Sequence, residues 1–141
     1  MIRCLDVSAL AKRYVAEPRS KDVGRLLLDG IAVTGGLSEA EIAPALARRH
    51  RGGILTRTQR DRLLSAMQQD MASLYVVELS PEVSALACRL LMRHRLRAGD
   101  ALHLASALTL TGQSRLKVQF VGFDENLNEA AKQEGLELPA F

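Results

Sequence analysis

The chain has 141 residues, of which 48% are hydrophobic and 25% are charged, a composition that excludes intrinsic disorder. No run of about 18 apolar residues occurs, so no membrane span is expected, and the first ten residues are too charged for a secretory signal. The formal net charge of +3 identifies no partner by itself. Cys4 and Cys88 lie in apolar stretches without metal-site or disulfide spacing, which predicts two core residues in a reducing cytoplasm.

The pattern of apolar residues predicts strands and helices that alternate along the chain. In chain order, we expect a strand at residues 1–6, helices at 8–17 and 20–30, a strand at 31–35, helices at 38–50 and 57–72, a strand at 74–79, helices at 80–94 and 96–108, a strand at 117–124 and a helix at 125–135. Ser8, Ser38 and Ser80 are the expected N-caps of their helices, and Pro81 suits a first helical position. This order predicts one α/β domain over residues 1–141 with a mainly parallel sheet.

Four acidic residues stand at the ends of these elements. Asp6 and Asp124 end the first and last strands, whereas Glu41 and Asp100 fall in the first turns of their helices. In open parallel sheets, ligands bind beyond the carboxyl ends of the strands, and the following helices begin at the same edge. We therefore expect the four acids to converge, although they are scattered through the sequence.

Each acid also has a purely structural explanation. Asp100 suits a helix N-cap, Asp6 and Asp124 suit loops after strands, and Glu41 suits the positive end of a helix dipole. Glu39 would serve as well as Glu41, which we prefer because the apolar stripe of the helix starts directly after it. Carboxylates brought together repel one another unless a cation neutralises them, and hard oxygen ligands favour Mg²⁺ or Mn²⁺.

Two neighbouring polar residues, Ser8 and His103, carry weaker signals. A Ser–His–Asp triad is disfavoured because Ser8 has no nucleophile-elbow context. Ser8 is expected to cap its helix, and its hydroxyl is also a candidate to hold a metal-bound water. His103 is expected to be a hydrogen-bonded packing residue rather than a catalytic acid. The sequence contains no zinc-ligand spacing and no glycine-rich phosphate loop.

Arginines gather between residues 48 and 62, where six of them accompany a single acid, and again in "RHRLR" at residues 93–97. Arg48, Arg49, Arg51 and Arg57 are our candidates for contacts with phosphates. A solvated helix face explains either cluster equally well.

Four segments resemble the motifs of PIN-domain ribonucleases. They are "CLDVSALAKRYVAEP", "LSEAEIAPALARR", "LRAGDALHLASAL" and "FVGFDENLNEAA", which follow the order of that family over residues 2–131. The first and third are specific, whereas the second is loose. The size of the chain makes it most similar to VapC-type toxins of toxin–antitoxin systems.

The resemblance implies a Rossmann-like three-layer sandwich with a mainly parallel five-stranded sheet, an acidic pocket for Mg²⁺ or Mn²⁺, a homodimer and a cognate antitoxin. The metal-binding acids that it implies are Asp6, Glu41, Asp100 and Asp124. Gly122 departs from the pattern, since relatives often have Thr or Ser two residues before the last acid. This difference puts a supporting hydrogen bond in doubt.

The function expected from the sequence is a Mg²⁺- or Mn²⁺-dependent endoribonuclease of the cytoplasm, in which a divalent ion activates water and arginines grip the RNA backbone. A metal-dependent phosphatase or phosphoacceptor domain is an alternative, because Asp6 ends the first strand. That class calls for an acid where Ser8 stands and for a lysine late in the sheet, where Lys117 is poorly placed. A non-catalytic PIN-like interaction module is the other alternative.

Overall fold

The computed structural model describes residues 1–141 as a parallel sheet of four strands with seven helices. The elements are β1 (Ile2–Leu5), α1 (Val7–Ala11), α2 (Ser20–Leu28), β2 (Ile31–Gly35), α3 (Ser38–Arg51), α4 (Arg57–Ser73), β3 (Tyr75–Val77), α5 (Pro81–Arg93), α6 (Ala98–Gln113), β4 (Val118–Val121) and α7 (Glu125–Gln133). The strands pair in the order β3-β2-β1-β4, and all pairs are parallel. The elements predicted from the apolar pattern are therefore all present.

The fifth strand implied by the family resemblance is absent. The segment after α7 makes a single parallel bridge, between Gln119 of β4 and Glu137, and the N–H of Phe120 donates to the carbonyl of Glu137. The chain leaves the edge of the sheet directly afterwards, so this contact does not extend into a ladder. The expectation of five strands is wrong, and the sheet has four.

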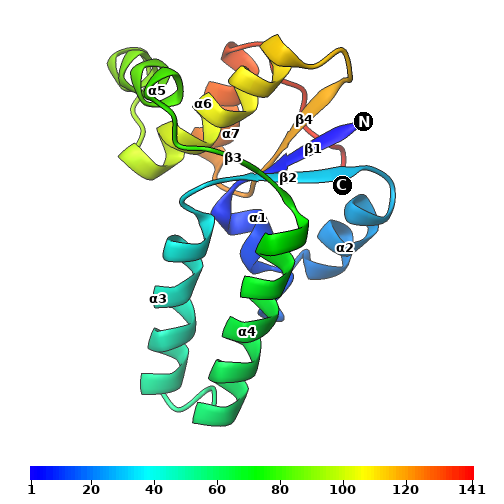
Figure 1. Cartoon of the computed structure of the whole chain (residues 1–141), viewed down its shortest axis with the longest axis vertical. Coiled ribbons are helices and arrows are strands. Elements are labelled where there is room, and N and C mark those ends of the chain that lie inside the picture. The colour runs from blue at the N-terminus through cyan, green and yellow to red at the C-terminus, as the bar shows by residue number, and fades with distance from the viewer.

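Helices cover both faces of the sheet and form three layers with it. In Figure 1, α5, α6 and α7 lie on one side of the strands, and α1 to α4 lie on the other. Alternate residues of a strand point to opposite faces, so Cys4 packs with α5, α6 and α7, whereas Leu5 packs with α1 to α4. The parallel strands are buried on both faces, as expected for an α/β sandwich.

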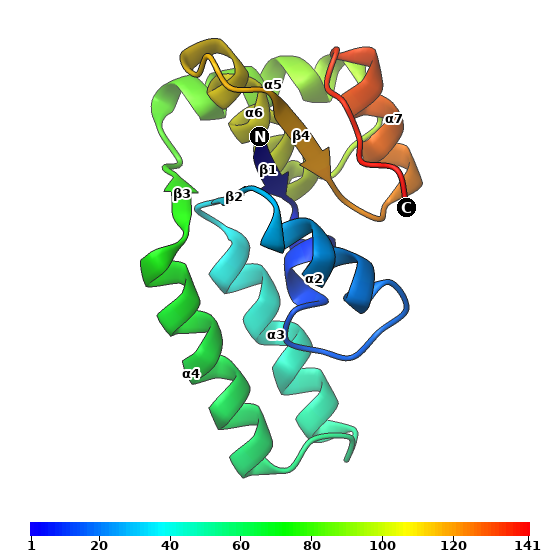
Figure 2. The same ribbon diagram turned by 90° about the vertical axis from the view of Figure 1, so that its right-hand side faces the viewer.

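The hairpin of α3 and α4 projects away from the rest of the molecule (Figures 1 and 2). Thr56 begins α4 with a capping box, in which its hydroxyl accepts from the N–H of Gln59 and the Gln59 side chain accepts from the N–H of Thr56. Asp70 of α4 ties the hairpin to the body, because it accepts hydrogen bonds from Tyr14 and Arg13. No helix combines the length and hydrophobicity needed to cross a bilayer.

Three local predictions need correction. Ser8 does not cap α1, because Asp6 occupies the N-cap position and accepts from the N–H of Ala9. Ser38 is the first residue of α3 rather than its cap, and its buried hydroxyl lies 2.6 Å from that of Thr34. Cys88 is exposed on α5, so it is not a core residue.

Two other local predictions are confirmed. Ser80 caps α5, accepting from the N–H of Val83, and Pro81 is the first helical residue. Cys4 lies in the core, where burial raises the pKa of its thiol to about 12 and makes the reactive thiolate inaccessible at neutral pH.

Candidate active site

The four predicted acids lie at the carboxyl edge of the sheet. Asp6 follows β1 and Asp124 follows β4, which is the neighbour of β1, while Glu41 and Asp100 occupy the first turns of α3 and α6. The sheet order changes direction between β1 and β4, since β2 and β3 lie on the other side of β1. Such a switch point is where open α/β sheets bind ligands.

Asp6 is the deepest of these acids, with only 2% of the residue exposed. Its Oδ1 accepts a hydrogen bond of 2.7 Å from the Ser8 hydroxyl and one of 2.9 Å from the N–H of Ala9. Burial raises the pKa of Asp6, the two hydrogen bonds and the charge of His103 lower it, and the charge of Asp100 raises it further. The net shift is upward, and burial is its largest cause.

Asp100 and Asp124 continue this electrostatic chain. Burial raises the pKa of Asp100, and the charge of Asp124 raises it further, whereas a backbone hydrogen bond from Arg97 and the charges of Arg97 and His103 lower it. Asp124 caps α7, because its Oδ1 accepts from the N–H of Leu127 at 2.8 Å, and its side chain is exposed to solvent. The charge of Asp100 therefore acts on Asp6, and that of Asp124 acts on Asp100.

Glu41, rather than Glu39, faces the other acids. Its Oε1 lies 2.6 Å from Nε2 of the buried His103, one turn after Asp100 in α6. Glu39 is exposed to solvent and takes part in no side-chain hydrogen bond. Of the two glutamates that the sequence left open, Glu41 is the one that contacts α6.

Asp6, Asp100 and Asp124 have no Lys or Arg partner in an ion pair, and Glu41 pairs only with His103. The side chains nevertheless do not close into a cluster of three or more acidic, His or Cys groups around a common point. The donor set fits a hard divalent cation in type and charge, because it offers carboxylate oxygens, of which those of the three aspartates form no ion pair within the chain. Its side chains would have to draw together around the ion.

Two glycines give the carboxylates their room. A Cβ at residue 99 would lie 2.8 Å from Oε2 of Glu41, and a Cβ at residue 122 would lie 2.9 Å from Oδ2 of Asp6. Cβ atoms do not approach other atoms so closely, so each site requires glycine while the acids keep these positions. In the sequence, Gly122 lacks the hydroxyl of the Thr or Ser that the family resemblance leads one to expect. In the structure, the absence of a side chain at this position leaves space for Asp6.

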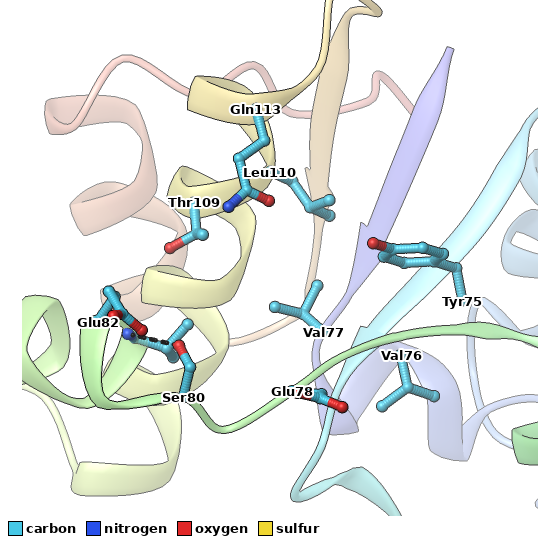
Figure 3. Close-up of a pocket in the computed structure, with 10 residues that line it drawn as sticks. Tyr75, Val76, Val77, Glu78, Ser80, Glu82, Thr109, Leu110 and Gln113 are labelled. Atoms are coloured by element: carbon cyan, nitrogen blue, oxygen red, sulfur yellow. Dashed lines mark hydrogen bonds between the residues drawn. The ribbon is translucent and has the colours of Figure 1, made fainter.

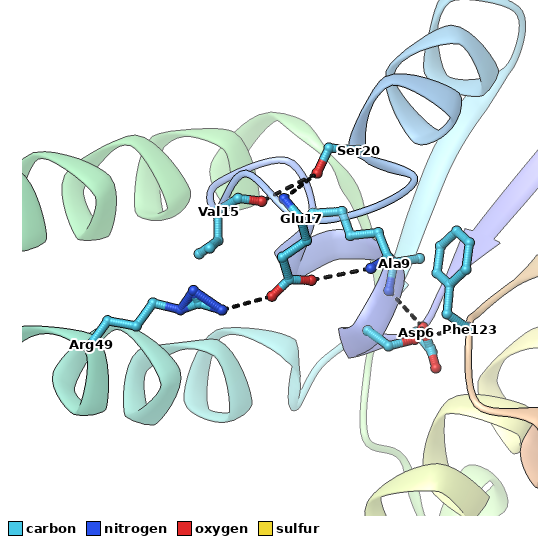
Figure 4. A network of polar contacts seen from close by, with 9 residues as sticks. Asp6, Ala9, Val15, Glu17, Ser20, Arg49 and Phe123 are labelled. Atoms are coloured by element: carbon cyan, nitrogen blue, oxygen red, sulfur yellow. Dashed lines mark hydrogen bonds and ion pairs between the residues drawn. The ribbon is translucent and has the colours of Figure 1, made fainter. Parts of the chain in front are cut away.

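A second polar network lies beside the acids (Figure 4). Glu17 forms an ion pair with Arg49 of α3 at 2.8 Å and a second ion pair with Lys12 at 3.1 Å. The ammonium of Lys12 also lies 4.7 Å from the ring centre of Phe123, next to Asp124. The sequence missed this network, because its members come from the α1–α2 connection, α3 and the β4–α7 loop.

Ser8 links the two strand ends at the pocket. Its hydroxyl donates to Asp6 and accepts from the N–H of Phe123 at 3.0 Å. This places the residue in a supporting position for Asp6, rather than in a triad with His103, whose Nε2 bonds Glu41.

The arginine candidates separate into two groups. Arg48, Arg51 and Arg57 are exposed around the tip of the α3–α4 hairpin, and none of them forms an ion pair within the chain. The guanidinium of Arg49 is instead engaged with Glu17.

A separate cavity of about 390 Å³ lies between β3, α5 and α6 (Figure 3). Tyr75, Glu78 and Gln113 are among the side chains that line it, and none of the four acids does. It is therefore distinct from the acidic pocket.

The fold and the four acids together define an α/β protein with an acidic pocket at the carboxyl edge of its sheet. The chain belongs to the PIN domain family, which it matches over residues 3–133. No curated protein sequence matches it significantly.

Several solved structures share the fold. FitAcB from Neisseria gonorrhoeae superposes with a TM-score of 0.71 at 16% identity, covering 99% of this chain and 97% of that chain. VapC20 from Mycobacterium tuberculosis, described as a sarcin–ricin loop cleaving toxin, gives 0.65 at 17% identity over 91% and 94%. VapBC2 from Rickettsia felis, bound to a DNA fragment from its promoter, gives 0.68 at 12% identity over 99% and 98%.

Proposed function

We propose that this protein is a divalent-metal-dependent endoribonuclease and the toxin of a toxin–antitoxin pair. The observation that carries the proposal is the placement of four acidic residues at the carboxyl edge of the sheet, where Asp6, Asp100 and Asp124 form no ion pair with a Lys or Arg. Membership of the PIN domain family supports it, and so does the fold shared with VapC20. A cation offsets the mutual repulsion of such acids, which otherwise costs stability.

Asp6, Glu41, Asp100 and Asp124 would hold Mg²⁺ or Mn²⁺. When bound, such an ion lowers the pKa of a water molecule and offsets negative charge on the leaving oxygen of a phosphodiester. Ser8 and the N–H of Ala9 hold Oδ1 of Asp6, so that the second oxygen of this carboxylate stays available. Glu41 would ligate the ion or orient the attacking water.

The α3–α4 hairpin would supply contacts with the RNA backbone. Arg51 follows Glu41 by ten residues of the same helix, so the tip lies about 15 Å from the pocket along α3. Free guanidinium groups at that distance, on Arg48, Arg51 and Arg57, suit phosphates remote from the scissile bond. A structured RNA that reaches both places is the substrate that we propose.

The partners proposed here come from the same comparison. Structures of FitAcB and VapBC2 are similar to this chain in fold, and we propose that this chain likewise assembles with an antitoxin and forms a homodimer in the cytoplasm. An antitoxin that offers an arginine to the four acids would be electrostatically matched to the pocket.

The structure gives less support to a phosphatase or phosphoacceptor domain. Ser8 stands where that class would need a second acid, and its hydroxyl is occupied by Asp6 and Phe123. Lys117 precedes β4, at the opposite edge of the sheet, and pairs with Glu137 at 2.8 Å. A lysine in that position does not reach a phosphate held near Asp6.

The test compares the wild type with Asp100→Asn and with Asp29→Asn, which alters an exposed carboxylate at the end of α2. Structured RNA is incubated with each protein in Mg²⁺, Mn²⁺ or EDTA, and a phosphomonoester is offered in parallel. We expect the wild type and Asp29→Asn to cut RNA only with a divalent ion, and folded Asp100→Asn to cut at least 100-fold more slowly, since one metal ligand is lost. Equal cutting by Asp100→Asn, or hydrolysis of the phosphomonoester alone, contradicts the proposal. A protein that binds RNA but cuts neither substrate supports the interaction module.

A further inference from the structure

A hydrogen bond between His103 and Glu41 joins α6 to α3 beside the acids. Nε2 of His103 lies 2.6 Å from Oε1 of Glu41, although 62 residues separate them. The His103 side chain is 3% exposed and that of Glu41 is 30% exposed. A buried nitrogen thus donates to a carboxylate that is partly exposed to solvent.

The imidazole has little freedom to leave this position. A Cβ on Gly35, the last residue of β2, would lie 3.0 Å from Nδ1 of His103 and 3.4 Å from Cε1. The ring therefore packs directly against the strand end, in a space that glycine leaves open. A side chain confined in this way holds its hydrogen bond in one direction.

The second oxygen of Glu41 lies close to the same helix. Oε2 lies over Gly99, where a Cβ would come within 2.8 Å. Gly99 and His103 lie on either side of Asp100 in α6, and both border the Glu41 carboxylate. The segment "GDALH" thus contains both residues of α6 that border Glu41 of α3.

We propose that His103 is a positioning residue for Glu41: its Nε2–H holds Oε1, so that Oε2 is the oxygen presented on the Asp100 side of the pocket. This inference rests on the proposed function, in which Glu41 ligates the ion or orients water. His103 itself touches neither. Hydrogen bonds of this kind fix the orientation of a ligand, and their loss typically weakens metal binding or activity about 10–100-fold.

The experiment measures Mn²⁺ affinity by calorimetry, single-turnover RNA cleavage and Tm for four variants. They are His103→Leu, His103→Gln, Glu41→Gln and the double variant His103→Leu with Glu41→Gln. We expect His103→Leu to weaken Mn²⁺ binding and cleavage at least tenfold, and His103→Gln, which keeps an N–H donor, to recover most of that loss. In the Glu41→Gln background, His103→Leu should cause no further loss, because its effect passes through Glu41.

A second pair of variants keeps the test decisive if His103→Leu does not fold. Gly99→Ala leaves His103 intact but displaces Oε2 of Glu41, and Gly112→Ala changes the same helix where nothing lies within 4 Å. Alanine favours a helix over glycine, so both proteins should fold. We expect weaker Mn²⁺ binding for Gly99→Ala and wild-type binding for Gly112→Ala.

Two results overturn the inference while leaving the proposed function intact. One is wild-type Mn²⁺ affinity and cleavage in folded His103→Leu or Gly99→Ala. The other is a loss on His103→Leu that is as large in the Glu41→Gln background as in the wild type. A wild-type protein that neither binds Mn²⁺ nor cuts RNA overturns the proposed function, and this inference with it.

Discussion

Gly122 tests whether the pocket depends on a fixed position of Asp6. A Cβ at residue 122 would lie 2.9 Å from Oδ2 and 3.0 Å from Cγ of Asp6. Asp6 has little room to retreat, because Ser8 and Ala9 hold its other oxygen and the residue is almost fully buried. We therefore expect Gly122→Ala to displace the carboxylate or to strain the loop after β4.

The size of the effect follows from this contact. Inserting a methyl group into a well-packed site costs about 1–3 kcal/mol. For a chain of this length, that cost corresponds to a fall in Tm of about 3–10 °C. Gly24→Ala in α2 is the matched control, because nothing lies within 4 Å of a Cβ there. A strain-free Gly→Ala change stabilises by about 0.4–1 kcal/mol.

Thermal unfolding followed by circular dichroism, together with Mn²⁺ calorimetry, measures both consequences. Gly122→Ala should unfold at lower temperature and bind Mn²⁺ more weakly, whereas Gly24→Ala should do neither. Gly122→Thr, which introduces the hydroxyl that the family resemblance leads one to expect, should be more damaging than Gly122→Ala. Wild-type Tm and Mn²⁺ affinity in Gly122→Ala would refute the argument that Asp6 is held in place.

Two further predictions concern charge. Burial and the charge of Asp124 raise the pKa of Asp100, so the folded state binds its proton more tightly than the unfolded chain does. The wild type should therefore lose stability as the pH rises from about 3.8 through the raised pKa of Asp100. Without a divalent ion, the Tm of Asp100→Asn should rise relative to that of the wild type over this pH range. A difference in Tm between the two proteins that does not change with pH contradicts this prediction. Replacing Arg48, Arg51 and Arg57 by Gln should make the slope of log affinity for structured RNA against log salt shallower by about 2 to 3, and an unchanged slope would exclude these residues from the interface.

Strands and helices were predictable because burial imposes short-range periodicity. The strands of this parallel sheet are mostly apolar, and α4 and α5 begin at recognisable residues, Thr56 and Pro81. The caps were less predictable. Ser8 and Asp6 both suit an N-cap, and the tertiary contact between Ser8 and the N–H of Phe123 decides between them.

The sequence predicted which acids lie at the carboxyl edge of the sheet, but it did not predict their contacts with other side chains. The end of a parallel strand and the start of the next helix meet at one edge of the sheet, so Asp6 and Asp124 could be placed from the order of elements. The pairing of Glu41 with His103 depends on how α3 and α6 pack, which no local pattern reveals. The spaces at Gly99 and Gly122 are likewise properties of tertiary contact.

The structural and functional explanations of these acids, which the sequence set against each other, are compatible in the folded protein. Asp6 and Asp124 each cap a helix through Oδ1, and Glu41 is held by His103 through Oε1. In each case one oxygen is fixed by the chain and the other takes no hydrogen bond from it. Capping therefore orders the side chain without consuming its capacity to bind a cation. Since asparagine caps a helix about as well as aspartate, Asp→Asn at these positions removes the charge and leaves the cap in place.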